Sequence, residues 1–229
     1  MLDVGNTQTV ITVMPAIFPK CANRLPGILA IGVLLVSGGV TAGVWYYFTP
    51  KYTRVGYQPI QPVSFSHALH VDQVGMDCRY CHDGVENSWY SNVPSAATCM
   101  NCHKQILKDD PKLALVRESY ELEKPIPWIQ IHKLPDYVYF NHSVHVKRGI
   151  SCVHCHGPVH QMDEVFHAQP LSMTFCLDCH RNPGPNLRPQ DKITRLDWDP
   201  HQHLPKDWFS KTAAEWRVNA SHNCSACHR

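Results

Sequence analysis

The sequence predicts one N-terminal transmembrane helix followed by a domain of short helices and irregular chain with little sheet. Three observations predict this class. Residues 25–48 carry no charged side chain, 18 prolines are spread along the chain, and ten of the 11 cysteines lie in five copies of Cys-x-x-Cys-His. Proline interrupts regular structure, and so many short motifs leave little room for long helices or a sheet.

A helix over residues 25–48 would be about 36 Å long, enough to cross a hydrocarbon core of about 30 Å. A cleaved signal peptide has a shorter apolar region. Lys20 and Arg24 precede this stretch and Lys51 and Arg54 follow it, so the basic residues do not orient the helix.

Each Cys-x-x-Cys-His motif fits covalent haem attachment, in which two thiols add to the porphyrin vinyl groups and the histidine holds the iron. Tetrahedral zinc sites would combine the pairs two by two and leave one over, and disulfides would not need a histidine each time. We therefore expect five c-type haems. The attaching cysteines are Cys78, Cys81, Cys99, Cys102, Cys152, Cys155, Cys176, Cys179, Cys224 and Cys227, and the proximal iron ligands are His82, His103, His156, His180 and His228.

Five haems change the expected architecture, because the chain beyond residue 48 offers only about 36 residues for each haem, too few for a separate apolar core. The haems themselves are expected to form the core. Covalent haem is installed on exported chain, so residues 1–24 are expected in the cytoplasm and the haem domain on the periplasmic side. Cys21 is expected to be an inert thiol, with palmitoylation as the alternative.

An internal duplication organises the chain. Phe-Ser-His-Ala-Leu-His at 65–70 precedes two motifs, and Phe-Asn-His-Ser-Val-His at 140–145 precedes the next two at matching distances. We expect a cytoplasmic segment, the transmembrane helix, a tether, two two-haem modules, and a C-terminal segment that wraps and carries the fifth haem. Their ranges are 1–24, 25–48, 49–64, 65–122, 123–182 and 183–229.

The 16 histidines exceed the five that the motifs use, which favours a second histidine on most irons. Two histidines at i and i+3 point the same way, so they cannot clamp one iron between them. His67 and His70 are therefore expected to serve two different haems, and His142 and His145 likewise. His132 is expected as the fifth distal ligand, with a buried structural histidine as the alternative.

The roles of several other side chains near the motifs are left open by the sequence. No spacing rule selects among His201, His203 and His222, and His154 is expected to be exposed. Met162 and Met173 offer thioether ligands or packing against haem edges.

The formal charge is +2 with basic and acidic residues interspersed, which argues against binding to nucleic acid. The paired Phe-x-His-x-x-His elements and the Cys-x-x-Cys-His pairs resemble class III multihaem cytochromes. Residues 125–145, "CVHCHGPVHQMDEV" and "LSMTFCLDCHRNP", together with the single span, resemble more closely the pentahaem subunit of alternative complex III.

That resemblance implies an electron-transfer subunit, with no catalytic residue of its own, of a quinol:electron-acceptor oxidoreductase in a bacterial plasma membrane. Implied partners are an iron-sulfur subunit, polytopic quinol-binding subunits, and a monohaem cytochrome c or another soluble acceptor. The alternative is a stand-alone, membrane-anchored multihaem quinol dehydrogenase. Residues 25–48 lack a carboxylate or histidine to accept a quinol proton, which favours the subunit. Gly39 and Gly43 have the spacing of a helix-packing motif.

Overall fold

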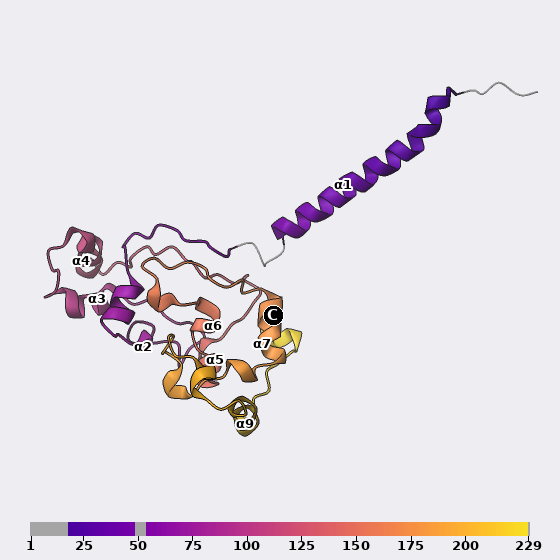
Figure 1. Cartoon of the computed structure of the whole chain (residues 1–229). Helices are drawn as coiled ribbons and strands as arrows, with labels where there is room; N and C mark the ends of the chain where they lie inside the picture. Colours follow the sequence, from indigo (N-terminus) through magenta and orange to yellow (C-terminus); the bar gives the residue numbers. More distant parts are fainter. Residues whose placement is uncertain (1–17, 49–53, 229) are drawn as a thin grey trace, which may run out of the picture. The chain divides into compact units, whose positions relative to one another are not determined.

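A computed structural model describes residues 18–48 and 54–228 of the chain, which divides into two units at Phe48 and Thr49. The first unit contains η1 (Lys20–Arg24) and α1 (Leu25–Phe48). Helix α1 covers the expected apolar residues and has the length and composition to cross a membrane (Figure 1). Cys21 is exposed in η1.

The second unit consists of short helices joined by irregular chain, as expected, and in its described part the only β-pairings are two isolated bridges, Val138 with His228 and Ile150 with Leu187 (Figure 1). Its helical elements are η2 (Ala68–Gln73), α2 (Cys78–Cys81), α3 (Ala96–His103), η3 (Pro111–Leu113), α4 (Ala114–Glu121), α5 (His142–Lys147), α6 (Val153–His156), η4 (Val159–Gln161), α7 (Met173–Arg181), η5 (Gly184–Asn186), η6 (Gln190–Lys192), α8 (Pro200–His203), α9 (Trp208–Glu215) and α10 (Cys224–Cys227).

Three of the five motif helices, α2, α7 and α10, begin where a side-chain cap satisfies a free backbone N–H group. Asp77 accepts from the backbone of Arg79 at the start of α2, and Asn223 accepts from Ser225 at the start of α10. Such caps fix the first turn, which in these helices also carries the first motif cysteine. In α2 and α10 the local sequence therefore fixes where the motif helix begins.

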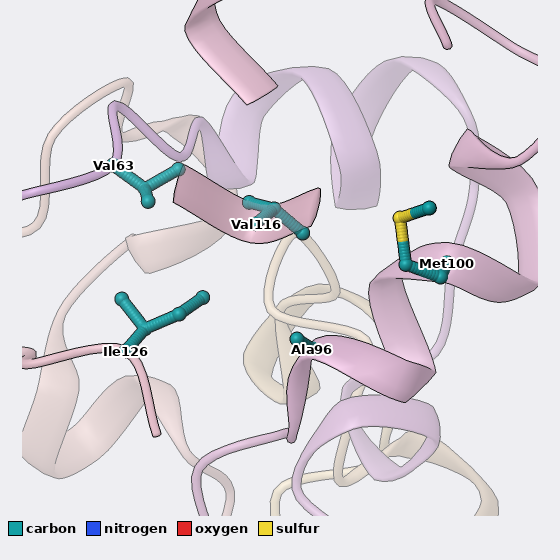
Figure 2. Packing of buried hydrophobic residues seen from close by; sticks show 5 residues of the cluster. All are labelled: Val63, Ala96, Met100, Val116 and Ile126. Atoms are coloured by element: carbon teal, nitrogen blue, oxygen red, sulfur yellow. The ribbon is translucent and has the colours of Figure 1, made fainter. Parts of the chain in front are cut away.

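Few apolar side chains are buried in the described part of the domain. One small cluster, shown in Figure 2, joins α3 and α4 through Val63, Ala96, Met100, Val116 and Ile126. The centre of the domain is instead a continuous cavity of about 3780 Å³. An ordinary small-molecule pocket is about 300–1,000 Å³.

Hydrogen bonds hold the segment that follows the first unit against the rest of the domain. The expected tether falls partly on residues 49–53, which lie outside the described residues. Beyond them, Gln61 exchanges two hydrogen bonds with Ile129, and Gly56 donates to the carbonyl of His167. Residues 54–64 are therefore held against the rest of the domain.

The segment after residue 183 runs over the second module and reaches the first. Arg188 donates its backbone N–H to Gly149, and Ser151 donates its hydroxyl to Ile193. Thr194 reaches Asp77 in the first module at 2.9 Å.

Candidate haem-binding sites

All five Cys-x-x-Cys-His motifs line the central cavity. We number the sites in chain order: site 1 at 78–82, site 2 at 99–103, site 3 at 152–156, site 4 at 176–180 and site 5 at 224–228. All 11 cysteines are free. Within the described ranges, no three His, Cys, Asp or Glu side chains gather to hold one metal ion.

Four motif histidines each face a second histidine across the cavity. The pairs and their ring-centroid distances are His67 with His82 at 6.5 Å, His70 with His103 at 6.2 Å, His142 with His156 at 6.4 Å, and His145 with His180 at 6.2 Å. Two metal–imidazole bonds of about 2.0 Å, each extended by about 1.1 Å to a ring centre, require about 6.2 Å. The distances fit one iron between each pair.

The two histidines of each Phe-x-His-x-x-His element face different motifs. His67 lies opposite site 1 and His70 opposite site 2, while His142 lies opposite site 3 and His145 opposite site 4. Each element thus spans two neighbouring sites from one short helix, the arrangement that the i, i+3 spacing predicts.

The first histidine of each element lies edge-on to the phenylalanine two residues before it. The centroid distances are 4.9 Å for Phe65 with His67 and 4.8 Å for Phe140 with His142. The second histidine stacks on the same phenylalanine, at 4.4 Å for His70 and 4.5 Å for His145. Each phenylalanine thus orients both rings, a role that its presence in both copies of the duplication could have indicated.

Hydrogen bonds at Nδ1 orient most of these rings. Because a carbonyl oxygen only accepts, Nδ1 carries the proton and Nε2 keeps a lone pair free to bind a metal. The Nδ1-to-carbonyl distances are 2.8 Å from His70 to Ser66, 2.7 Å from His82 to Asn92, 3.1 Å from His103 to Ile106, 2.8 Å from His142 to Trp89, 2.8 Å from His145 to Asn141, 2.7 Å from His180 to Ser221 and 3.3 Å from His228 to Tyr137.

Burial keeps several of these imidazoles neutral, the form that binds iron. Burial, followed by the nearby His82, lowers the pKa of His67 to about 4. Burial, followed by His132, lowers the pKa of His156 to about 3.

His132, expected as the fifth distal ligand, lies beside site 3 in the structure. Its ring lies beside His156 at 4.4 Å, edge to face, and beside His167 at 5.1 Å. Burial, followed by His167, lowers the pKa of His132 to about 4. The ring that accompanies His228 is that of Tyr137, at 5.8 Å. The ligand assignment of His132 stays a prediction without a contact to site 5.

The two methionines and His154, which the sequence left as further candidates, differ in where they lie relative to the cavity. Met162 is buried and lies outside the cavity lining, whereas Met173 lines the cavity. His154 is half-buried with its Nε2 shielded from solvent, so the expectation that it is exposed is wrong. The reason is that the C-terminal segment covers it: burial, followed by the positive charge of Arg188, lowers its pKa.

Thiols of neighbouring sites lie close together. Cys78 of site 1 and Cys152 of site 3 lie close enough for their thiols to interact, which lowers the pKa of Cys78 and raises that of Cys152. Burial, followed by the nearby Cys99 of site 2, raises the pKa of Cys81 in site 1.

The thiols of sites 3, 4 and 5 also lie close to those of the next site. Burial, followed by Cys176 and Cys179 of site 4, raises the pKa of Cys155 in site 3 to about 12. Burial, followed by Cys227 of site 5, raises the pKa of Cys176. These neighbouring thiols order the five sites as a row, 2, 1, 3, 4, 5.

The cavity, the histidine pairs and the adjacent cysteine pairs fit a protein whose core is a set of covalently attached haems. Residues 123–198 match the family described as Cytochrome c552. Over 183 residues the chain is 30% identical to the menaquinone reductase multiheme cytochrome c subunit of Nitratidesulfovibrio vulgaris (strain Hildenborough), across 71% of this chain and 83% of that protein. It is 25% identical over 205 residues to cytochrome c-552 of Maridesulfovibrio salexigens, across 68% of this chain and 40% of that protein.

The chain belongs to the multihaem cytochrome c family, whose members carry covalently attached c-type haem. Neither of these two relatives is described as a subunit of alternative complex III. The number of haems, the ligand of each iron and the partner subunits remain predictions.

Proposed function

We propose that this chain is a membrane-anchored pentahaem electron-transfer subunit of a quinol:electron-acceptor oxidoreductase of the alternative complex III type. The row of five sites is the observation that carries the proposal. Because each site adjoins the next, electrons would pass between sites 2 and 5 without leaving the chain, and these two end sites would exchange electrons with partners.

Bound haem would supply the one-electron chemistry, and the chain would supply attachment and ligation. The motif cysteines would hold each porphyrin, and the paired histidines would close both axial positions at sites 1 to 4. The paired imidazoles and their orienting carbonyls provide ligation but no group that would act on a substrate. This arrangement supports a carrier in preference to a reductase with open irons.

The composition of helix α1 supports the role of a subunit in a larger complex over that of a stand-alone quinol dehydrogenase. Quinol oxidation releases protons as well as electrons and needs a proton acceptor in an enclosed pocket. Helix α1 offers no carboxylate or histidine, so polytopic partner subunits would bind the quinol. An iron-sulfur subunit would deliver electrons, and a monohaem cytochrome c or another soluble acceptor would receive them, on the periplasmic side of a bacterial plasma membrane.

A second candidate is the reverse direction, with electrons passed toward quinone. The Nitratidesulfovibrio relative is a menaquinone reductase subunit, which favours this direction. The same row of sites would serve either direction, because the end that accepts electrons depends on the partners.

Purification of the full chain from its native membrane in mild detergent tests the assignment. Co-purifying polytopic and iron-sulfur subunits are expected, and rapid mixing should show fast haem reduction by a menaquinol analogue only in the assembled complex. Fast, inhibitor-sensitive reduction of the isolated chain would support the stand-alone dehydrogenase instead. Fast oxidation of reduced haems by menaquinone in the complex, without quinol oxidation, would support the reverse direction.

Removal of the end haems tests the row. The double substitution Cys99→Ser and Cys102→Ser removes the attachment at site 2, and Cys224→Ser with Cys227→Ser does the same at site 5. Each should block one half-reaction of the complex, quinol to haem or haem to acceptor, and leave the other intact. Equal loss of both half-reactions in both variants would contradict a linear row.

A further inference from the structure

A third histidine is oriented in the same way as two of the expected distal ligands. Nδ1 of His70, His145 and His203 each donates to the carbonyl four residues earlier, at 2.8 Å to Ser66, 2.8 Å to Asn141 and 2.7 Å to Asp199. In all three cases the proton is fixed on Nδ1 and the Nε2 lone pair is left free.

An aromatic ring stacks on the same histidine in each of the three segments, always five residues before it. The distances and interplanar angles are 4.4 Å and 25° for Phe65 with His70, 4.5 Å and 29° for Phe140 with His145, and 5.3 Å and 25° for Trp198 with His203. Asp199 also caps α8 by accepting from His201, as Asn141 caps α5 by accepting from Ser143. The segment 198–203 therefore repeats the ligand-presenting geometry of 65–70 and 140–145.

The segment 198–203 lacks one feature of the other two segments. Pro200 stands where the other two segments have their first histidine, so this segment presents one ring in place of two. A Nδ1 bond to the carbonyl four residues earlier also occurs as a local feature of short helices. The aromatic stack is common to all three segments, and the side-chain cap is shared with 140–145. The stack distinguishes His203 from His201, whose ring lies instead against Phe209 at 4.9 Å.

His203 is not directed at any of the five sites. Its side chain is exposed, and it does not line the cavity that contains all five motifs. Trp198 lies under the guanidinium of Arg188 at 5.7 Å, and the backbone N–H of Arg188 donates to the carbonyl of Gly149, three residues before Cys152 of site 3. Site 5 lies elsewhere, beside Cys176 and Tyr139.

We propose that His203 is an axial ligand for the iron of a haem carried by another polypeptide, one whose iron keeps a free axial position. Nε2 would donate its lone pair to that iron and displace a bound water, with no change in oxidation state. The segment that carries α8 lies near site 3, in the middle of the row. Electrons would therefore pass between the partner's haem and site 3, and the partner's haem would form a side branch of the row. The branch rests on the proposed electron-transfer function, whereas ligation by His203 does not.

The test uses the full haem-loaded chain in detergent and, as probe, a water-soluble haem peptide with one axial histidine and one free axial position. Binding of Nε2 converts the probe from high spin to low spin, which difference absorption and electron paramagnetic resonance both report. The wild type and His201→Ala, the matched control on the same helix, should bind the probe equally. His203→Ala should bind it at least about tenfold more weakly.

Three results would overturn the proposal: no conversion of the probe by the wild type, equal conversion by His203→Ala, or a high-spin change in one of the chain's own haems in His203→Ala, which would place His203 on an internal iron. Haem content and the reduced absorption spectrum of each variant verify folding. None of these outcomes depends on which subunits co-purify with the chain, so this test can fail while the proposed function holds.

Discussion

His142 donates its Nδ1–H to the backbone carbonyl of Trp89 at 2.8 Å, across 53 residues of sequence. The ring that faces site 3 is therefore oriented by a loop that follows site 1. Ser143 reinforces the connection by donating its backbone N–H to Ser88 at 3.1 Å. The two modules of the duplication share this support, which accounts for the closeness of sites 1 and 3.

Replacement of the two histidines of α5 should affect different haems. His142→Ala should open the iron of site 3 and His145→Ala that of site 4, because each faces a different motif histidine. Each variant is expected to gain about one equivalent of carbon monoxide binding in the reduced state, and the double variant about two. His201→Ala serves as control. If both single variants perturbed the same haem, the assignment of one ligand to each site would fail.

The wild-type chain should bind at most one carbon monoxide per molecule. Four motif histidines have a facing histidine, whereas in the described part of the chain the ring recorded next to His228 is that of Tyr137. Titration of the reduced protein with carbon monoxide, followed at the haem absorption band, measures the stoichiometry. Two or more equivalents would contradict closed irons at sites 1 to 4.

The denatured polypeptide should retain five haems, because all five motifs line the same cavity and none differs in its residue pattern. Mass spectrometry of the intact chain should show five haem units above the mass of the bare polypeptide. Cys224→Ser with Cys227→Ser should reduce the count to four. A wild-type count of four or fewer would mean that one motif does not attach haem.

Two matched glycines should respond differently to substitution by alanine. Gly75 and Gly149 occupy equivalent places before sites 1 and 3 and have positive φ angles of 79° and 82°. A Cβ at Gly75 would meet nothing within 4 Å, whereas one at Gly149 would lie 2.7 Å from the carbonyl oxygen of Arg188 and 2.8 Å from the Trp216 ring. Backbone strain alone costs about 1–2 kcal/mol.

Gly75→Ala should therefore lower the unfolding temperature by a few degrees, and Gly149→Ala, with overpacking of about 1–3 kcal/mol added, by roughly twice as much. Thermal unfolding followed by circular dichroism measures both. Equal shifts would mean that the C-terminal segment does not hold Arg188 and Trp216 against Gly149 in solution.

Asp77 should make a small contribution to stability that disappears in acid. Hydrogen bonds from the Arg79 side chain are the main cause that lowers the pKa of Asp77 from 3.8 to about 2. A carboxyl whose pKa is lower in the folded state stabilises the fold above its unfolded pKa, and this stabilisation is lost as the pH falls from about 4 to about 2.

Asp77→Asn keeps a cap residue but loses the charge, so near neutral pH it should be less stable by about 0.2–1 kcal/mol, since the pair is largely exposed. Its difference from the wild type should vanish near pH 2 in denaturant titrations. Glu86→Gln removes the other carboxylate that contacts Arg79 and serves as control. A difference that stayed constant from pH 7 to pH 2 would contradict the role of the charge.

The attachment residues stay a prediction, which the sequence makes on its own because each motif is local. Covalent attachment uses residues within five positions, so spacing alone identifies Cys78, Cys81 and His82, and the repeated Phe-x-His-x-x-His identifies the histidines that α5 and η2 present. The prediction that the two histidines of each element serve different sites followed from helix geometry. The structure adds their facing partners and distances.

The position of His132 and the geometry around His203 were not predictable in the same way. His132 lies in an apolar sequence context that fits several buried roles, and its contacts with His156 and His167 come from segments that are far apart along the chain. Trp198 in place of phenylalanine, and Pro200 in place of histidine, hide the third segment from a pattern search, although its hydrogen bond and stacking repeat those of the other two.

The sequence by itself predicted which residues attach haem, showed that the Phe-x-His-x-x-His element and its motifs are duplicated, and identified the apolar helix that precedes them, because spacing and periodicity within a few residues carry this information. Only the tertiary structure decided the order in which the sites adjoin and the burial of His154. These depend on contacts between segments far apart in the chain, such as Cys78 with Cys152 and Cys176 with Cys227. Their physical cause is the folding of the chain around one common cavity, which brings distant motifs side by side and leaves α8 outside it.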